Sequence, residues 1–188
     1  IIAGGDGSDI VLSADDSLTL YGSLTADDQI SLTAGQYVVD DTVSIRTEGT
    51  SFMSTTGEQG EILINGLNDV EINSVVGSGS ADLRMINIRS SAGDVLIDRE
   101  SGRIESDALI RLSGNGVDVQ GAVINTAATN NVNDFEVLVD VAGPVLVSGD
   151  LQMAGSLKIV SETSIDIFSG EVEAADAGQR IVLESAGN

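Results

Sequence analysis

The stretch that decides the fold is IVLSADDSLTLYGSLTADDQISL, residues 10–32. Its apolar residues come in pairs with one spacer between them, as in Ile10 and Leu12 or Ile30 and Leu32, and this period of two indicates β-strands. Segments rich in Asp, Ser and Gly separate the pairs and have the composition of turns. Ile30 follows Ile10 by 20 residues. A self-similar unit of that length, with three short strands, predicts one turn of a β-solenoid.

The leading pair of this unit recurs along the chain. After Ile10/Leu12 and Ile30/Leu32 it is found at Ile62/Ile64, Ile86/Ile88, Ile110/Leu112, Val137/Val139, Leu157/Ile159 and Ile181/Leu183. The steps between successive pairs are 20, 32, 24, 24, 27, 20 and 24 residues. We therefore predict an all-β fold, a right-handed parallel β-helix (β-solenoid) of about eight rungs, each of roughly 20–27 residues.

Each rung is expected to carry two further strands. Second strands are predicted at Leu18/Leu20, Val70/Ile72, Val95/Ile97, Val117/Val119, Val145/Val147 and Ile165/Ile167, and third strands around Leu24, Val75, Ile104, Val123, Leu151 and Val172. The long second step is expected to hold strands at Tyr37/Val39 and Val43/Ile45. Loop excursions are predicted near 47–60, which is rich in Thr, Gly and Ser, and near 125–134, which is rich in Asn. The pairs recur throughout, so residues 1–188 are predicted to form one continuous solenoid segment.

Two other architectures fit part of this pattern. An antiparallel β-sandwich would also show short strands and turns, but its strands need no leading pair that recurs every 20–27 residues. A left-handed solenoid would fit the six-residue spacing of Leu12, Leu18, Leu24 and Ile30, but that spacing ends at Gln36. No helical stripe of apolar residues is visible.

Composition limits the function classes. The chain is 41% hydrophobic but only 3% aromatic, and its net charge is −22, from 30 acidic and 8 basic residues. This charge argues against nucleic acid and anionic membranes as partners. The chain has no Cys and no His, so thiol and imidazole chemistry are absent, and no run approaches the ~18 apolar residues of a membrane span. The sequence shows no polar end caps, and we expect an interior segment of a longer polypeptide.

Three phrases carry a family resemblance. DIVLSA (9–14), SLTLYGSLTA (17–26) and QISLTAG (29–35) resemble the repeats of filamentous haemagglutinin-type exoproteins and of other giant bacterial surface adhesins. The resemblance implies a long right-handed parallel β-helix that is secreted and displayed at the bacterial cell surface. It implies a structural or adhesive role as a stalk, adhesin or extracellular filament. The partners would then be other segments or copies of the same protein, and a host or matrix surface.

One glycine-rich segment fits a calcium motif. GGDGSDIV, residues 4–11, matches the calcium-binding nonapeptide pattern, with Asp6 and Asp9 as the candidate Ca²⁺ ligands. Such a site needs tandem copies, and only one copy is visible. The alternative is a glycine-rich turn that leads into a strand. The acidic doublets Asp15-Asp16, Asp27-Asp28 and Asp40-Asp41 likewise suit either solvated turns or weak cation sites.

No catalytic residue or organic cofactor is expected. A carbohydrate-active β-helix enzyme is the alternative from another class, with Asp98, Arg99, Glu100 and Arg103, or Glu71 with Arg84, as its charged candidates. Scattered aromatic residues form no sugar-stacking platform, and such charge pairs are usually surface ion pairs. A calcium-dependent binding module is a third candidate.

The outward positions suggest a lateral contact. If the leading pairs point inward, the residues between them point outward. Apolar residues at such positions could contact a neighbouring copy or another segment of the same protein; they are Val11, Leu63, Leu96, Leu138, Leu146 and Val182. Scattered surface apolar residues are also normal in any protein.

Overall fold

Every predicted leading pair lies in a β-strand of one parallel sheet. The computed structural model describes residues 1–35, 45–47, 52–55, 60–77, 84–127, 135–175 and 179–187, and these hold strands and turns but no helix. The leading sheet has eight strands, namely β1 (Ile10–Ala14), β4 (Gln29–Ala34), β7 (Glu61–Gly66), β10 (Met85–Ser90), β13 (Leu109–Gly114), β16 (Val137–Val141), β19 (Leu157–Ser161) and β22 (Ile181–Ser185).

Two further parallel sheets complete the solenoid. The second sheet contains β2 (Leu18–Leu20), β5 (Ile45–Thr47), β8 (Val70–Ile72), β11 (Val95–Ile97), β14 (Val117–Val119), β17 (Val145–Val147) and β20 (Ile165–Ile167). The third sheet contains β3 (Leu24–Ala26), β6 (Phe52–Thr55), β9 (Val75–Val76), β12 (Arg103–Ser106), β15 (Ala122–Asn125), β18 (Asp150–Met153) and β21 (Val172–Ala174).

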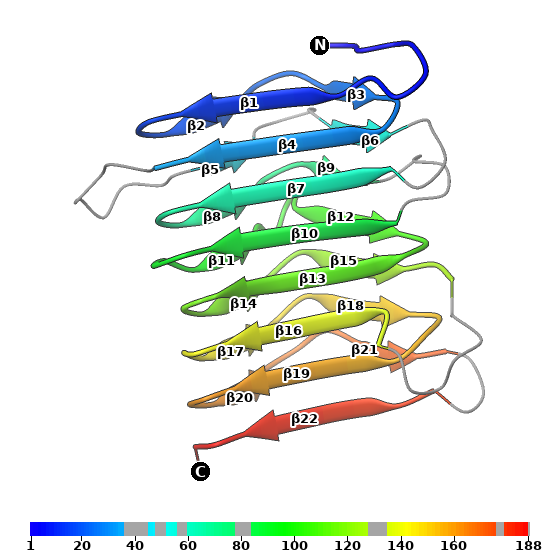
Figure 1. The fold of residues 1–188 in the computed structure, drawn as a ribbon. Coiled ribbons are helices and arrows are strands. Elements are labelled where there is room, and N and C mark those ends of the chain that lie inside the picture. Colours follow the sequence, from blue (N-terminus) through cyan, green and yellow to red (C-terminus); the bar gives the residue numbers. More distant parts are fainter. Residues whose placement is uncertain are drawn as a thin grey trace.

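The coil is a right-handed parallel β-solenoid, as predicted. In Figure 1 the leading strands run to the left at the front, the third-sheet strands return to the right behind them, and the chain descends from the N-terminus to the C-terminus. The described strands make seven complete three-strand turns, and β22 begins an eighth. The number of complete turns is thus slightly below the eight rungs predicted.

Register between turns follows the leading pairs. Ile62 pairs with Ile86 and Ile86 with Ile110, so each inward residue stacks on its counterpart in the next turn. Backbone hydrogen bonds then run along the solenoid axis, at a strand spacing of about 4.8 Å. Alternation fixes this register, because a slip of one residue would turn the whole apolar set outward.

The core is a stack of aliphatic side chains. Val, Ile and Leu fill most of the inward positions of all three sheets, and most of these side chains are fully buried. Leu157 on β19 is 0% exposed, whereas Ile181, which pairs with it on β22, is 42% exposed. Burial of one turn therefore depends on the turn that stacks on it, as expected for a solenoid.

The loop predicted near 47–60 requires correction. It contains β6, which pairs with β3 and β9 in the third sheet, and Thr47 ends β5. Met53, Ser54 and Thr55 are all buried, and the Ser/Thr-rich composition hid this strand from the apolar pattern. The strand predicted at Tyr37/Val39, the start of that at Val43/Ile45 and most of the 125–134 excursion lie outside the described residues, while Asn125 ends β15.

Candidate functional site: a polar groove on the leading sheet

Outward side chains of β10, β13 and β16 form two adjacent columns. Asn87, Arg111 and Leu138 pair in one column. Arg89, Ser113 and Asp140 pair in the other. Inward neighbours such as Ile88 and Leu112 anchor these strands in the core, so alternation holds the polar side chains on the outer face.

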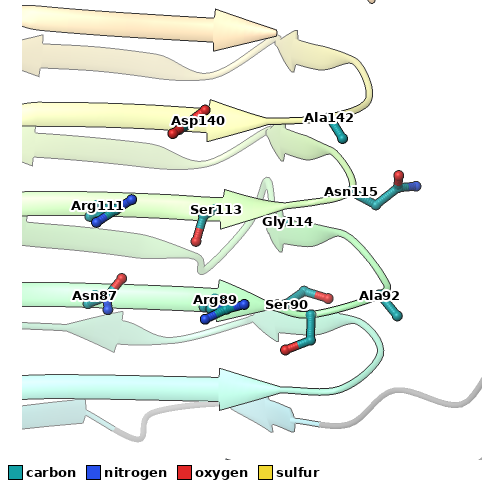
Figure 2. Close-up of a pocket in the computed structure, with 11 residues that line it drawn as sticks. Asn87, Arg89, Ser90, Ala92, Arg111, Ser113, Gly114, Asn115, Asp140 and Ala142 are labelled. Atoms are coloured by element: carbon teal, nitrogen blue, oxygen red, sulfur yellow. The ribbon is translucent and has the colours of Figure 1, made fainter. Parts of the chain in front are cut away.

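A groove of about 500 Å³ runs over these columns and the adjoining corners. Figure 2 shows Arg89 and Arg111 on adjacent strands, with Ser113 beside Arg89 and Asp140 one strand further on. Small residues border the groove where the strands turn, namely Ala92, Gly114 and Ala142. Their size leaves the space open.

The corner below the groove is held by hydrogen bonds of Ser90. Its hydroxyl donates to the carbonyl oxygen of Asn68 at 2.7 Å and accepts from the amide of Gly93 at 2.8 Å. Ser90 is 3% exposed, so the wall of the groove is set by buried contacts.

Among the other basic side chains that the structure describes, four have a partner and the exposed Arg99 has none. Arg84 pairs with Glu61 at 3.1 Å. Arg103 pairs with Glu105 at 2.8 Å, and Lys158 with Glu184 at 3.0 Å. The guanidinium of Arg180 lies 5.1 Å from the centre of the Phe135 ring.

By contrast, Arg89 and Arg111 are exposed and form no ion pair or hydrogen bond through their side chains within the described part of the chain. Arg111 pairs with Asn87, and Arg89 lies two residues beyond Asn87, so the two guanidinium groups belong to diagonal neighbours on adjacent strands. Asp140 lies diagonally beyond Arg111 on the other side. Two unpaired arginines at diagonal positions on adjacent strands can bind one anion between them.

Asn87 adds an unsatisfied acceptor to the groove. Its Oδ1 atom is covered and has no hydrogen-bond donor. Figure 2 shows this oxygen turned toward the strand that carries Arg111. A covered acceptor without a donor costs free energy, about 1–3 kcal/mol, which a bound hydroxyl would recover.

Sequence reasoning did not single out this groove. The available signal was an outward Arg on each of two successive leading strands, at Arg89 and Arg111. Their juxtaposition depends on the 24-residue register between β10 and β13, which pairs Met85 with Leu109.

The two calcium candidates lie near the first turn. Asp6 is exposed, and Asp9 accepts a hydrogen bond from the amide of Gln29 at 3.1 Å through Oδ1. The amide of Gly7 donates to Asp27 Oδ2 at 2.8 Å. The carboxylates of Asp9 and Asp27 thus accept hydrogen bonds from backbone amides of the neighbouring turn. Within the described ranges, no group of three or more His, Cys, Asp or Glu side chains could hold a metal ion.

Other corner acids act in the same way. The Asp69 carboxylate accepts from the amide of Asp94 at 2.8 Å, and Asp150 accepts from that of Glu171 at 3.1 Å. These acids supply acceptors where strand pairing is interrupted at the corners.

The charged residues weighed as an enzyme site are only partly brought together. Asp98 Oδ2 caps its own turn by accepting from the amides of Glu100 and Ser101 at 3.0 and 3.2 Å. Arg99, Glu100 and Arg103 line a second concavity of about 340 Å³.

The other proposed pair is not formed as expected, because Arg84 pairs with Glu61. Glu71 lies on β8 and has an interaction of its own.

The lateral-contact candidates fall on two sheets. Val11, Leu63, Leu138 and Val182 share one outward column of the leading sheet, in which Ser31 separates Val11 from Leu63. Asn87 and Arg111 separate Leu63 from Leu138, and Lys158 separates Leu138 from Val182.

On the second sheet, Asp118 lies between Leu96 and Leu146. Among the six candidates Val11 is the most open, at 66% exposed. The apolar side chains therefore alternate with polar ones along each column.

Comparison with protein-family models, curated proteins and solved structures found no match to this chain. In the described ranges, no helix long and apolar enough to cross a membrane occurs.

Proposed function

We propose that this chain is a structural and adhesive rod segment of a giant secreted or cell-surface bacterial protein. Stacked turns form the stalk, and its outer faces carry the contacts. The partners are other segments or copies of the same protein and a host or matrix surface. The resemblance of residues 9–35 to adhesin repeats supports this assignment.

The single observation that carries the proposal is the unbroken register of the leading sheet. Eight strands pair in parallel from β1 to β22 without a change of direction. At about 4.8 Å per turn, the seven steps span about 34 Å. Such a stack transmits load through backbone hydrogen bonds along its axis and can be lengthened by adding turns.

Surface charge supports the same role. A net charge of −22 makes copies of this chain repel one another at long range, so they resist random aggregation. Acids at the strand edges also oppose unwanted edge-to-edge pairing.

Labelling of source cells with an antibody against the folded chain tests the proposal. We expect label outside the cell envelope. A parent protein with Ile97→Asp, which places a charge in the core, should lose its surface fibre and the attachment of cells. Thr19→Asp, which places the same charge at an exposed outward position of the second sheet, is the matched control and should keep the fibre. Cytoplasmic label, or normal fibres with both variants, would refute the rod.

Calcium would add a second role to the first turn. Asp6 and Asp9 would need ligands from a preceding repeat, as in tandem nonapeptide motifs. Calorimetric titration tests this: heat on adding Ca²⁺, together with a lower melting temperature after chelation, would favour the calcium-dependent module. Absence of both effects would leave Gly4–Asp9 as a turn.

The second concavity favours one alternative, a carbohydrate-active enzyme. Arg99, Glu100 and Arg103 share it with Asp150. If the chain cleaves an oligosaccharide, Glu100→Gln should abolish the activity while leaving the unfolding curve unchanged. A survey of acidic and neutral oligosaccharides without any turnover would remove this alternative.

A further inference from the structure

The unpaired arginines define a ligand site. We propose that the groove over Arg89 and Arg111 binds an acidic sugar through its carboxylate group, with the sugar hydroxyls on the neighbouring polar side chains. This inference is independent of the proposed structural role. The chain could be a rod segment that binds no sugar, and it could bind a sugar without being part of a stalk.

Charge placement points to the carboxylate. Acids outnumber bases 30 to 8 in this chain, yet neither arginine takes an acid as partner within the described ranges. Diagonal neighbours on adjacent parallel strands lie about 8 Å apart at Cα, so two long side chains can converge on one anion. Arginine binds carboxylates through paired N–H groups of fixed geometry.

The remaining lining fits hydroxyl groups. Ser113, Asn115 and Asp140 supply donors and acceptors around the two arginines. The covered Oδ1 atom of Asn87 still needs a donor, which a sugar hydroxyl can provide. Protein interfaces are built around an apolar core, whereas the apolar side chains that line this groove are those of Ala92 and Ala142. A saccharide therefore fits better than an acidic protein segment.

The overall charge limits the ligand to one or few negative groups. A net charge of −22 repels polyanions at long range. A single carboxylate held between two guanidinium groups is dominated by local attraction, because salt screens more distant charges beyond about 8 Å. The ligand class is thus a saccharide with a single carboxylate, such as one uronic acid residue in an otherwise neutral chain, and not a polyuronate.

Arginine side-chain NMR tests the site directly. Seven of the 8 basic residues are arginines, so the spectrum of arginine Nε–Hε groups holds few signals to assign. Three probes are added separately to the folded chain: glucuronic acid, glucose as the neutral sugar, and glutarate as a carboxylate without a sugar ring. We expect glucuronic acid to shift the Arg89 and Arg111 signals, with glucose and glutarate about tenfold weaker or inactive.

Variants distinguish binding in the groove from a general effect of the net charge of the chain. Arg111→Ser should abolish binding of glucuronic acid, and Arg111→Lys should weaken it because the paired N–H groups are lost. Arg180→Ser is the matched control, since Arg180 is an exposed basic side chain that lines neither concavity. It removes the same charge and should leave binding unchanged. Arg111 and Arg180 are both exposed, so matching unfolding curves are expected for all three variants.

The outcomes that overturn the proposal are distinct. Equal binding of glutarate would mean that the groove recognises an acidic side chain instead of a sugar. Equal binding of glucose would mean that the carboxylate is not recognised. Loss of binding in Arg180→Ser would mean that binding depends only on net charge, and absence of any shift at Arg89 and Arg111 would mean that there is no site.

Discussion

At the scale of single residues, the side of the sheet on which a side chain lies decides its contribution to stability. Leu96 and Ile97 are neighbours on β11, yet Ile97 is 0% exposed and Leu96 is partly open. A fully buried aliphatic side chain contributes about 1.5–3 kcal/mol through burial alone. Truncation of these two neighbouring residues, which are nearly equal in size and hydrophobicity, should therefore change the free energy of unfolding by very different amounts.

Truncation of these two residues tests that alternation. We expect Ile97→Ala to lower the free energy of unfolding by about 2–5 kcal/mol, since it leaves a cavity between stacked turns. Leu96→Ala should change it by about 1 kcal/mol or less. Urea unfolding followed by circular dichroism measures both. Similar losses in the two variants would contradict the inward assignment of Ile97.

Corner carboxylates are the second feature at this scale. Asp69 accepts a hydrogen bond from the backbone amide of Asp94, one turn away. We expect Asp69→Ala to cost about 1–2 kcal/mol because that amide loses its acceptor. Asp69→Asn keeps an acceptor oxygen and should retain most of the stability. The same urea experiment measures these changes.

Asp107 provides the control for the corner acids. It is an exposed acid in a turn and makes no hydrogen bond with its side chain in the described part of the chain. Asp107→Ala should therefore leave the free energy of unfolding within about 0.5 kcal/mol of the starting value. A loss equal to that of Asp69→Ala would show that net charge, and not the hydrogen bond, is responsible.

At the scale of elements, the corner between the second and third sheets is stacked from glycines. Gly102, Gly121, Gly149 and Gly170 occupy this corner in four successive turns. An added Cβ at Gly149 would overlap the carbonyl oxygen of Gly121, and one at Gly121 would overlap that of Gly102. The backbones of successive turns thus approach each other too closely for a side chain.

Substitution at this corner should be costly. We expect Gly121→Ala to lower the free energy of unfolding by about 1–3 kcal/mol, because backbone must move to admit the methyl group. Gly22→Ala is the matched control, since no atom lies within 4 Å of the position that an added Cβ would take there, and it should change stability by about 0.5 kcal/mol or less. Differential scanning calorimetry compares the two; equal melting temperatures would refute the close approach.

Strands could be predicted from the sequence where their inward, buried positions hold aliphatic residues. All eight leading strands followed from the sequence because each places two apolar side chains at inward positions. β6 was missed because its inward positions hold Met53 and the buried hydroxyl residue Thr55. A strand with Ser and Thr has the composition of a loop, and only its place between β3 and β9 identifies it.

The glycine corner and the polar groove could not be predicted for a different reason. Gly102, Gly121 and Gly149 are 19 and 28 residues apart, so no fixed period connects them. Arg89 and Arg111 meet only because β13 stacks on β10 in one particular register. Both features depend on how successive turns stack on one another, and this stacking cannot be predicted from the sequence of a single turn.

At the scale of the whole molecule, turns behave as interchangeable units held by register. Ile88 pairs with Leu112 across β10 and β13, so residues 88–111 amount to one turn of 24 residues. Removing this turn joins Asn87 directly to Leu112, which then takes the inward place of Ile88. β7 would pair with the joined strand, and β8 and β9 would meet β14 and β15. All three sheets would remain continuous.

Two deletions that differ by Arg111 alone test this modularity. Deletion of 88–111 should give a folded solenoid about 4.8 Å shorter with one cooperative unfolding transition. Deletion of 88–110 places Arg111 in the inward position of Ile88 and turns Leu112 outward, because alternation in a strand has a period of two. A charge without a partner would then enter the core, so this variant should unfold at much lower urea concentration or fail to fold.

The join lies in the middle of a strand for a physical reason. Ile86 is fully buried and precedes the join, so a flexible corner cannot absorb the slip of one residue. If the 23-residue deletion were as stable as the 24-residue deletion, the turns would not be locked by side-chain alternation. A stack that tolerates slippage could not carry load along its axis, and the rod proposed for this chain would lose its mechanical basis.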